Sequence, residues 1–153
     1  MESRQKTEEL IYQSSLAMDA GNFNGFLALC DEKFHYAITT YSPEIRKEMV
    51  WLEHDRDGMK TLFANLPKHN SDHSPLSRHV TVYLVEEQEP GRTAKVTSAL
   101  QVFRTTLDGG TTEMFAVGKM IDIVQLSVDG PKLLDRNIRL ETRMLGFGSH
   151  IPF

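Results

Sequence analysis

The chain has 153 residues, a net charge of −4 and a pI near 5.8, and its 17 basic residues do not cluster. This charge balance argues against a nucleic-acid surface or an anionic membrane surface. No apolar run approaches the ~20 residues of a membrane span, and the polar first ten residues lack a signal core. Cys30 is the only cysteine, which excludes a disulfide framework within the chain. We expect one domain over residues 1–153, located in the cytoplasm of a bacterium.

Two helices are predicted at the start of the chain. The first runs from Thr7 to about Ala20, with apolar residues at helical spacing, and Gly21 ends it. A second, short helix follows Asn22, and its buried stripe extends to Cys30. Both helices are amphipathic, so each needs a neighbouring apolar surface.

A hairpin and a third helix follow. The aromatic-rich segment Phe34–Tyr41 alternates as a strand does, Ser42-Pro43 is a turn, and Lys47–Leu52 is a second strand. Apolar residues at helical spacing predict a helix over Asp55–Leu66, and we expect Pro67 to stop it.

The second half of the chain consists of long, β-branched segments joined by Gly- and Pro-containing turns. The predicted strands are Val80–Glu86, Thr93–Thr106, Thr111–Val124 and Lys132–Thr142. On the last strand, Leu134, Ile138 and Leu140 are predicted to share one face, with Arg136 among them. Together these elements predict an α+β cone, in which a curved, mostly antiparallel six-stranded sheet wraps around three helices from the N-terminal half.

Charged residues crowd the two ends of the third helix and its loop. A group formed by His54, Asp55, Arg56, Arg78 and His79 could support acid–base chemistry if the loop folds back, because a carboxylate can orient an imidazole. In the structural alternative, which we favour, Asp55 caps the helix, and Arg56 and Arg78 tie the loop to the sheet or to a partner. Arg78 is expected to bridge to Asp55 or to a carboxylate of a partner chain.

Two weaker candidate sites involve other histidines. Asp31 and His35 could form an acid–base pair, although we expect Asp31 in the turn between helix and strand. His69, His73 and His79 are spaced like metal ligands, but their segment reads as a loop, which does not supply helical chelating geometry. A solvated or interface loop is the favoured interpretation.

The last residues of the sequence are apolar. Free chain ends usually fray, so Phe147, Ile151 and Phe153 are predicted to dock either on their own domain or on a neighbouring chain. The long sheet also presents edges that proteins commonly cover with partner subunits.

Three segments carry a resemblance to a known family: WLEHDRDGM, SPLSRHVTVYLV and the final strand KLLDRNIRLET. In order and spacing, the whole chain resembles the small (β) subunit of Rieske non-haem iron ring-hydroxylating oxygenases, which shares the cone fold of nuclear transport factor 2 and ketosteroid isomerase. The most specific pieces are Asp55-Arg56, Ser77-Arg78-His79 and the final strand.

The resemblance implies a non-catalytic role without a cofactor or metal in this chain. In that family the large (α) subunit carries the Rieske 2Fe-2S cluster and the mononuclear iron, and three small subunits form the base of an α3β3 assembly. One cysteine cannot build a Cys2His2 Rieske centre, and no 2-His-1-carboxylate set stands out. The residues that we assign to structural or subunit-interface roles are Trp51, Asp55, Arg56, Arg78, His79 and Phe153.

The segment Tyr41–Trp51 lacks the longer insertion of aromatic dioxygenases and is more similar to the small subunits of methanesulfonate monooxygenases. We therefore consider two alternatives for the substrate of the complex, an aromatic compound or a small organosulfonate. The rival hypothesis is a stand-alone dehydratase or isomerase, or a ligand-binding protein, that uses His54, Asp55 and His79. An enzyme needs an open cavity with a converging acid and base, whereas a scaffold can fill its cone with side chains.

Overall fold

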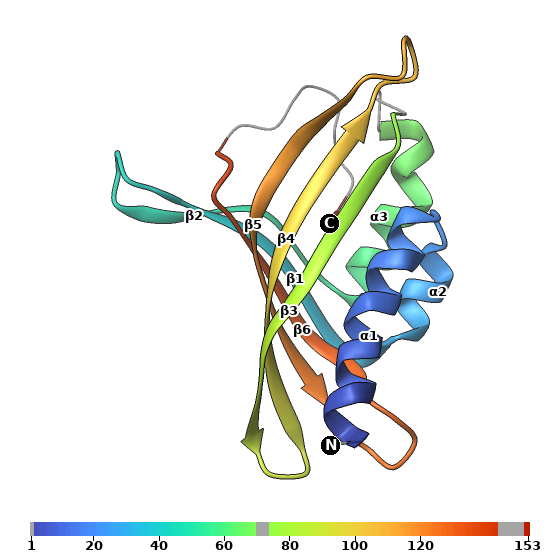
Figure 1. The fold of residues 1–153 in the computed structure, drawn as a ribbon, viewed down its shortest axis with the longest axis vertical. Helices are drawn as coiled ribbons and strands as arrows, with labels where there is room; N and C mark the ends of the chain where they lie inside the picture. The colour runs from blue at the N-terminus through green and yellow to red at the C-terminus, as the bar shows by residue number, and fades with distance from the viewer. Residues whose placement is uncertain (1, 70–73, 144–151) are drawn as a thin grey trace.

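The computed structural model describes residues 2–69, 74–143 and 152–153. Helices and a hairpin come first, and long strands complete the chain (Figure 1). In chain order the elements are α1 (Glu2–Asp19), α2 (Phe23–Ala28), β1 (Cys30–Ser42), β2 (Lys47–Asp55), α3 (Arg56–His69), β3 (Leu76–Glu89), β4 (Thr93–Thr105), β5 (Thr112–Gln125) and β6 (Lys132–Leu140).

The six strands form one sheet in the order β2-β1-β6-β5-β4-β3. Strands β3 to β6 make an antiparallel meander, and β1 also pairs with β2 in an antiparallel arrangement. The pairing of β1 with β6 is parallel, which is possible because α3 and the whole meander lie between them in the chain. The predicted mostly antiparallel six-stranded sheet is therefore confirmed.

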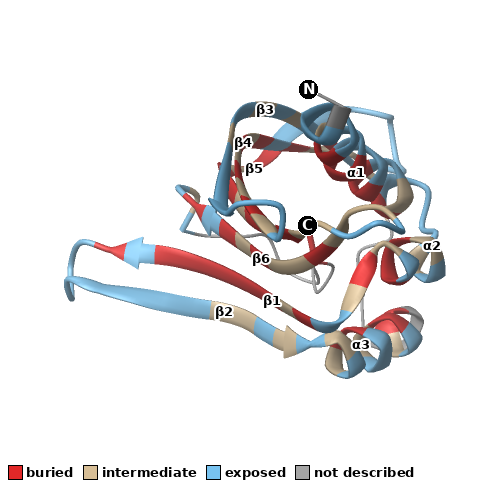
Figure 2. Cartoon of the chain, turned by 90° about the horizontal axis from the view of Figure 1, so that it is seen from below, coloured by how far each residue is buried: buried red, intermediate tan, exposed pale blue. Residues whose placement is uncertain are grey.

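The sheet curves around the helices. Seen from below, β3 to β6 bend into an arc that α1 faces across the core, while α2 and α3 lie beside β1 and β2 (Figure 2). Phe23 of α2 stacks on Phe63 of α3 at 4.4 Å between ring centroids, and Phe26 meets Phe34 of β1 edge to face at 6.0 Å. Such aromatic contacts add to burial of apolar area. They fix the two short helices at one side of the cone.

Helix α1 begins earlier than the sequence pattern predicts. The hydroxyl of Thr7 donates to the carbonyl of Ser3 at 2.7 Å, so Thr7 lies inside the helix and does not cap it. The preceding segment is rich in residues that favour helices, and Arg4 pairs with Glu8 one turn later. These local preferences extend the helix to Glu2.

The junction after α2 also differs from the prediction. The helix follows Asn22 as expected, and the Asn22 side chain caps it by accepting from the Gly25 N–H at 3.0 Å. Cys30, however, belongs to β1 and pairs with Leu133 of β6. Asp31 likewise lies in β1 and not in a turn, because pairing with the neighbouring strand draws this segment into the sheet.

Helix α3 continues past Pro67 to His69. A proline disturbs the helix on its N-terminal side, by removing one N–H and crowding an earlier carbonyl, but the residues after it can still complete the last helical turn. The prediction that Pro67 stops the helix is therefore wrong.

A register shift changes which leucine of β6 faces the core. Pairing with β5 passes from Leu133 directly to Asp135, so Leu134 is the extra residue of a bulge. Leu133 is fully buried, whereas Leu134 is only half-buried. The prediction that Leu134 shares a face with the other three is wrong, whereas Arg136, Ile138 and Leu140 are all buried on one face.

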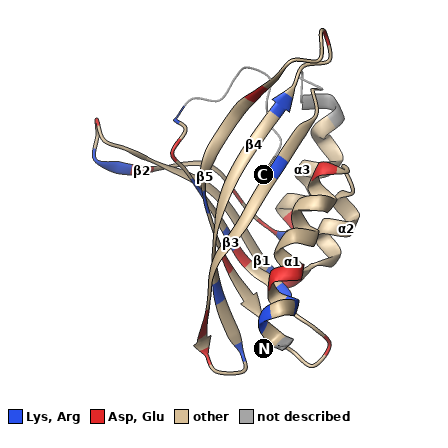
Figure 3. Cartoon of the chain, viewed as in Figure 1, with Lys and Arg blue, Asp and Glu red and all other residues tan. Residues whose placement is uncertain are grey.

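Basic and acidic residues are interspersed along the strands and helices (Figure 3). In the described part of the chain, every helix is too short or too polar to cross a membrane.

Candidate functional site

The predicted charged cluster begins where β2 meets α3. One carboxylate oxygen of Asp55 accepts a hydrogen bond from the Gly58 N–H at 2.8 Å, so Asp55 caps α3 as predicted. Arg56 donates from Nη2 to the carbonyl of Leu27 at 2.9 Å, which ties the start of α3 to the end of α2. His54 is partly buried beside Gly58. These contacts organise a helix junction.

Arg78 pairs with α1 and not with Asp55. Its Nη1 donates to Oδ1 of Asp19 at 2.9 Å, its backbone N–H donates to the same carboxylate, and its Nη2 donates to the carbonyl of Pro152 at 2.8 Å. Burial lowers the pKa of Arg78, and the Asp19 carboxylate opposes that shift. The predicted bridge to Asp55 is wrong, because Arg78 instead joins β3, the end of α1 and residue 152.

His79 lies apart from His54 and Asp55. Its Nε2 is 3.1 Å from the hydroxyl of Ser77, and its ring meets Phe103 edge to face at 4.9 Å between centroids. Its strand, β3, and the strand of His54 and Asp55, β2, form opposite edges of the sheet. The acid–base group proposed for a stand-alone enzyme is therefore not assembled by these three residues.

His35 contacts two carboxylates, but neither belongs to Asp31. Its Nε2 is 2.9 Å from Glu53 and its Nδ1 is 3.0 Å from Asp135, across three adjacent strands. Asp31 accepts from the backbone N–H of Lys33. Because ionised carboxylates only accept, both contacts at once require both ring nitrogens to carry protons. All three side chains are at least 40% exposed, so this bridge adds little stability.

Of the three histidines in the predicted metal-like series, the structure describes the side chain of His79 alone. His69 ends α3 and His79 lies in β3, while His73 is outside the described residues. Among residues 2–69, 74–143 and 152–153, no three His, Cys, Asp or Glu side chains are grouped to hold a metal ion. The composition also excludes a Rieske centre in this chain, because Cys30 alone cannot supply the two thiolates that such a centre needs.

The interior of the cone holds an ion pair that we did not predict. Nε of Arg136 donates to Asp122 at 2.6 Å, and its Nη2 donates to the hydroxyl of Ser14 at 2.8 Å. The two charged side chains are 1% and 0% exposed, and the guanidinium lies 5.7 Å from the centroid of the Phe26 ring. Burial raises the pKa of Asp122, and the adjacent guanidinium limits the rise. The sequence signal that could have revealed this pair was Arg136, a charged residue on the same face of its strand as apolar residues.

A second buried polar contact involves Tyr36 and residue 153. The Tyr36 hydroxyl donates to the Phe153 carbonyl at 2.9 Å and accepts from the Phe153 N–H at 2.6 Å. Burial raises the pKa of Tyr36 above its usual range. Phe153 is only 2% exposed and docks on its own chain, which was one of the two predicted outcomes. Phe147 and Ile151 lie outside the described residues.

Bulky side chains thus fill the centre of the cone. The largest fully buried ones are Arg136, Tyr36, Phe26, Phe34 and Phe153. Their polar atoms have hydrogen-bond partners, since Arg136 contacts Asp122 and Ser14, and Tyr36 contacts Phe153. This part of the interior has the character of a packed core.

The β1–β2 hairpin projects from the body as a long arm (Figures 1 and 2). Pairing with β1 passes from Leu52 to Val50, which leaves Trp51 as the extra residue of a bulge, where it packs against the core. Beyond this bulge the exposed apolar side chains are Tyr41 (56%), Ile45 (59%), Met49 (44%) and Val50 (58%). An apolar edge strand of this kind is a surface that proteins usually cover with a partner.

A groove of about 590 Å³ runs beside this arm, over β1, β2, β5 and β6. Its lining mixes apolar groups with both signs of charge: Thr39, Thr40, Tyr41, Glu48, Lys119, Ile121, Arg139, Leu140 and Glu141. The groove and the arm are continuous through Tyr41 and form one candidate interface.

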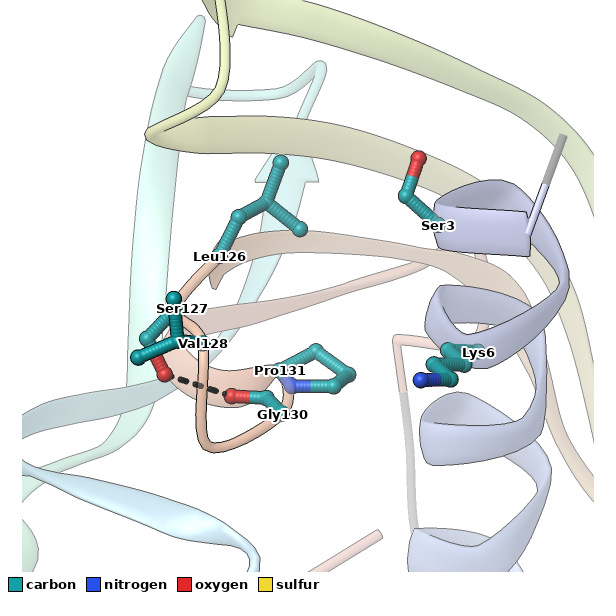
Figure 4. Close-up of a pocket in the computed structure, with 7 residues that line it drawn as sticks. All are labelled: Ser3, Lys6, Leu126, Ser127, Val128, Gly130 and Pro131. Atoms are coloured by element: carbon teal, nitrogen blue, oxygen red, sulfur yellow. Dashed lines mark hydrogen bonds between the residues drawn. The ribbon is translucent and has the colours of Figure 1, made fainter.

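A smaller hollow of about 210 Å³ lies between the start of α1 and the turn after β5 (Figure 4). Ser3 and Lys6 face Leu126 and Pro131 across it, and the hydroxyl of Ser127 is engaged with the Gly130 carbonyl at 2.8 Å. With no acidic residue in its lining, this hollow lacks an acid–base pair.

A family model described as the ring hydroxylating beta subunit matches residues 13–146. The chain belongs to this family of β subunits. It is 40% identical over 149 residues to the methanesulfonate monooxygenase hydroxylase subunit beta of Methylosulfonomonas methylovora, covering 93% of this chain and 82% of that protein. It is 28% identical to the 2-aminobenzenesulfonate 2,3-dioxygenase subunit beta of an Alcaligenes species, covering 94% of this chain and 95% of that protein.

A solved structure agrees with the fold. The beta subunit of a putative aromatic-ring-hydroxylating dioxygenase from Novosphingobium aromaticivorans superposes with a TM-score of 0.84 at 16% identity, covering 97% of this chain and 95% of that one. The family resemblance seen in the sequence is confirmed, and so is the predicted cone fold of the nuclear transport factor 2 type.

Proposed function

We propose that this β subunit is a non-catalytic, structural part of the terminal oxygenase of a multicomponent Rieske non-haem iron oxygenase that acts on an organosulfonate. The observation that carries the structural role is the packed cone, in which the Arg136–Asp122 pair and the Tyr36–Phe153 contact occupy the place of a substrate cavity. Both curated relatives are named for a sulfonate substrate, and the more similar one acts on methanesulfonate. A small alkanesulfonate is therefore the favoured substrate of the complex.

The redox groups belong to the partner in this proposal. A large α subunit carries the Rieske 2Fe-2S cluster and the mononuclear iron. In support, one cysteine cannot supply the two thiolates of a Rieske centre, and the described residues group no three His, Cys, Asp or Glu side chains. Three copies of the chain, each a single domain, form the base of an α3β3 complex in the bacterial cytoplasm.

The named residues divide into two roles. Asp55, Arg56, Arg78 and Phe153 hold helices, strands and residues 152–153 together through the contacts described above. Trp51 sets the bulge from which the apolar arm projects, and exposed His79 lies on the opposite edge strand. We assign the arm and the adjacent groove to contacts between subunits.

The first experiment separates this chain from the chemistry. The chain is purified alone and together with a Rieske-type large subunit, and iron content and sulfonate-dependent oxygen consumption are measured. We expect iron and activity with methanesulfonate only in the joint preparation. Stoichiometric iron or turnover in the chain purified alone would refute the structural role, and a joint preparation that oxidises only sulfonate-free aromatics would refute the substrate.

A second experiment tests assembly. Sedimentation equilibrium of the chain is expected to give a mass near three times 17.4 kDa. Val50→Asp places a charge on the apolar arm and should reduce both the trimer and the yield of complex. Val128→Asp is the matched control, because Val128 is fully exposed in the turn between β5 and β6, and Figure 1 shows this turn away from the arm. Equal assembly by the two variants would exclude the arm as the interface.

A further inference from the structure

The tip of the β1–β2 arm presents an apolar side chain beside a basic one. Ile45 is 59% exposed, and the exposed Arg46 follows it in the turn. Contacts of Glu44 hold the tip in shape: Nη1 of Arg143 donates to both of its carboxylate oxygens at 2.6 and 2.8 Å, and the Ser42 hydroxyl donates to it at 3.0 Å. A surface that is already ordered loses less conformational entropy when it binds.

The backbone of Arg46 does not explain why this residue is an arginine. Its φ of 53° lies in the left-handed region, which glycine adopts without steric cost and most other residues adopt rarely. Strained positions of this kind cluster at functional sites. The exposed guanidinium is therefore available to a partner.

The groove beside the arm offers a matching lining. Its volume of about 590 Å³ lies in the range of pockets that enclose a bound group, so it has room for several side chains. Ile121 and Tyr41 supply apolar surface, and Glu141 in the same groove makes only a loose contact with Lys119 at 3.8 Å. Because these two charged side chains are 69% and 46% exposed, their contact is weak. The groove suits an apolar side chain that has a cation beside it.

An arm cannot fold into its own groove. Tyr41 and Glu48, which belong to the arm, form part of the groove lining. Beyond the bulge the arm continues as four residue pairs, from Thr39 with Val50 to Ser42 with Lys47. At about 3.3 Å per residue this paired segment is about 13 Å long. Its tip lies beyond its own groove and can enter only the groove of another copy.

A contact between the tip of one copy and the groove of the next joins two different surfaces. Heterologous contacts of this kind form rings when the rotation closes. A ring of three copies leaves no tip and no groove uncovered. Pairing of two β2 edges would instead be two-fold and would leave both grooves open.

We propose that the arm tip of each copy seats in the groove of the next copy around the trimer. Ile45 of one copy packs on Ile121 and Tyr41 of its neighbour, and Arg46 lies beside the neighbour's Glu141. This inference rests on the trimer proposed above and specifies which surfaces form it.

The test places one cysteine in each of two differently tagged copies that are expressed together, Ile45→Cys in one and Ile121→Cys in the other. We expect a short bis-maleimide to join the two copies in mixed assemblies and to give no cross-link in assemblies of either variant alone. Both substitutions in one chain should yield a covalently linked trimer on a denaturing gel. Cys30 is buried and does not compete for the reagent. Val128→Cys with Ile121→Cys is the matched control, because Val128 is fully exposed in the turn between β5 and β6.

Each other outcome has a distinct meaning. A trimer that gives no cross-link between residues 45 and 121 overturns this inference and leaves the proposed function intact. A chain that stays monomeric both alone and with the large subunit refutes both. Cross-linked dimers of Ile45→Cys alone would show a two-fold contact between arms. An Ile45→Asp chain that forms the trimer but fails to join the large subunit would make that subunit the occupant. Either of these last two results also overturns the inference.

Arg46→Gly provides a second test that does not endanger folding, because glycine suits the left-handed backbone at this position. We expect the loss of the guanidinium to raise the dissociation constant of the trimer about tenfold in sedimentation equilibrium. Arg92→Gly is the matched control, since the side chain of Arg92 is 76% exposed in the turn between β3 and β4. Equal dissociation constants for the two glycine variants would overturn the assignment of Arg46 to the contact.

Discussion

Removal of Asp122 should expose the energetic importance of the ion pair inside the cone. In Asp122→Ala the guanidinium of Arg136, which is 1% exposed, would keep only the hydroxyl of Ser14 and the ring of Phe26 as partners. A buried charge that loses its counter-charge costs about 3–5 kcal/mol. For a chain of this size, a loss of that magnitude lowers the melting temperature by roughly 6–20 °C. Asp122→Asn should lose less, because its amide oxygen can still accept the hydrogen bond from Arg136.

Urea unfolding followed through the fluorescence of Trp51, the only tryptophan, measures the effect. Protein concentration must be held constant, since assembly adds to apparent stability. The double variant Asp122→Leu with Arg136→Met should recover most of the loss, because a buried pair can be replaced by apolar side chains of similar volume. A loss below about 1 kcal/mol in Asp122→Ala would mean that the pair is solvated like a surface pair. The reasoning would also fail if the double variant were less stable than Asp122→Ala.

Three further predictions concern other contacts. Arg78→Ala should lower the free energy of unfolding by about 3 kcal/mol, because Asp19 loses its partner. The turnover per assembled complex, measured by oxygen consumption, should stay near that of the parent. A hundredfold loss of turnover in an intact complex would contradict this prediction. Burial raises the pKa of Cys30 from 9.0 to about 12, so the folded chain holds the thiol proton more tightly than the unfolded chain and loses that stabilisation as the pH rises from 9 toward 12. Ellman's reagent at pH 8 should therefore label the thiol only in urea, and rapid labelling of the native chain would contradict its burial. Gly118→Ala should prevent normal folding, since a Cβ would overlap a backbone carbonyl of β6, whereas in Gly58→Ala the Cβ meets an imidazole that can rotate. Equal circular-dichroism melting curves for these two glycine variants would show that β5 and β6 can separate at no cost.

Local sequence signals predicted the features that depend on neighbouring residues. Asp55 caps α3 because a carboxylate before a helical segment reaches the N–H of Gly58 within a few residues. Turn residues and β-branched runs similarly defined the long strands, with errors mainly at their ends. The helices-then-strands order was enough to indicate the cone.

Boundaries failed where a distant strand competed with local preference. Cys30 completes a helical apolar stripe, yet it pairs with Leu133, which is far along the chain. The bulge at Leu134 shifted which side chain is buried, and a shift of one residue reverses the face of a strand.

The sequence by itself determined the order of the elements, the caps and turns, and the membership of a β-subunit family, because these are carried by local patterns and their spacing. Only the tertiary structure decided which charges meet. Arg78 lies beside Asp19, and Arg136 beside Asp122, because the curved sheet brings β3 against α1 and places β6 next to β5. Such pairs depend on strand order and register across long stretches of chain, and no spacing in the sequence encodes them directly. The same long-range geometry brings Tyr36 to Phe153 and fills the cone.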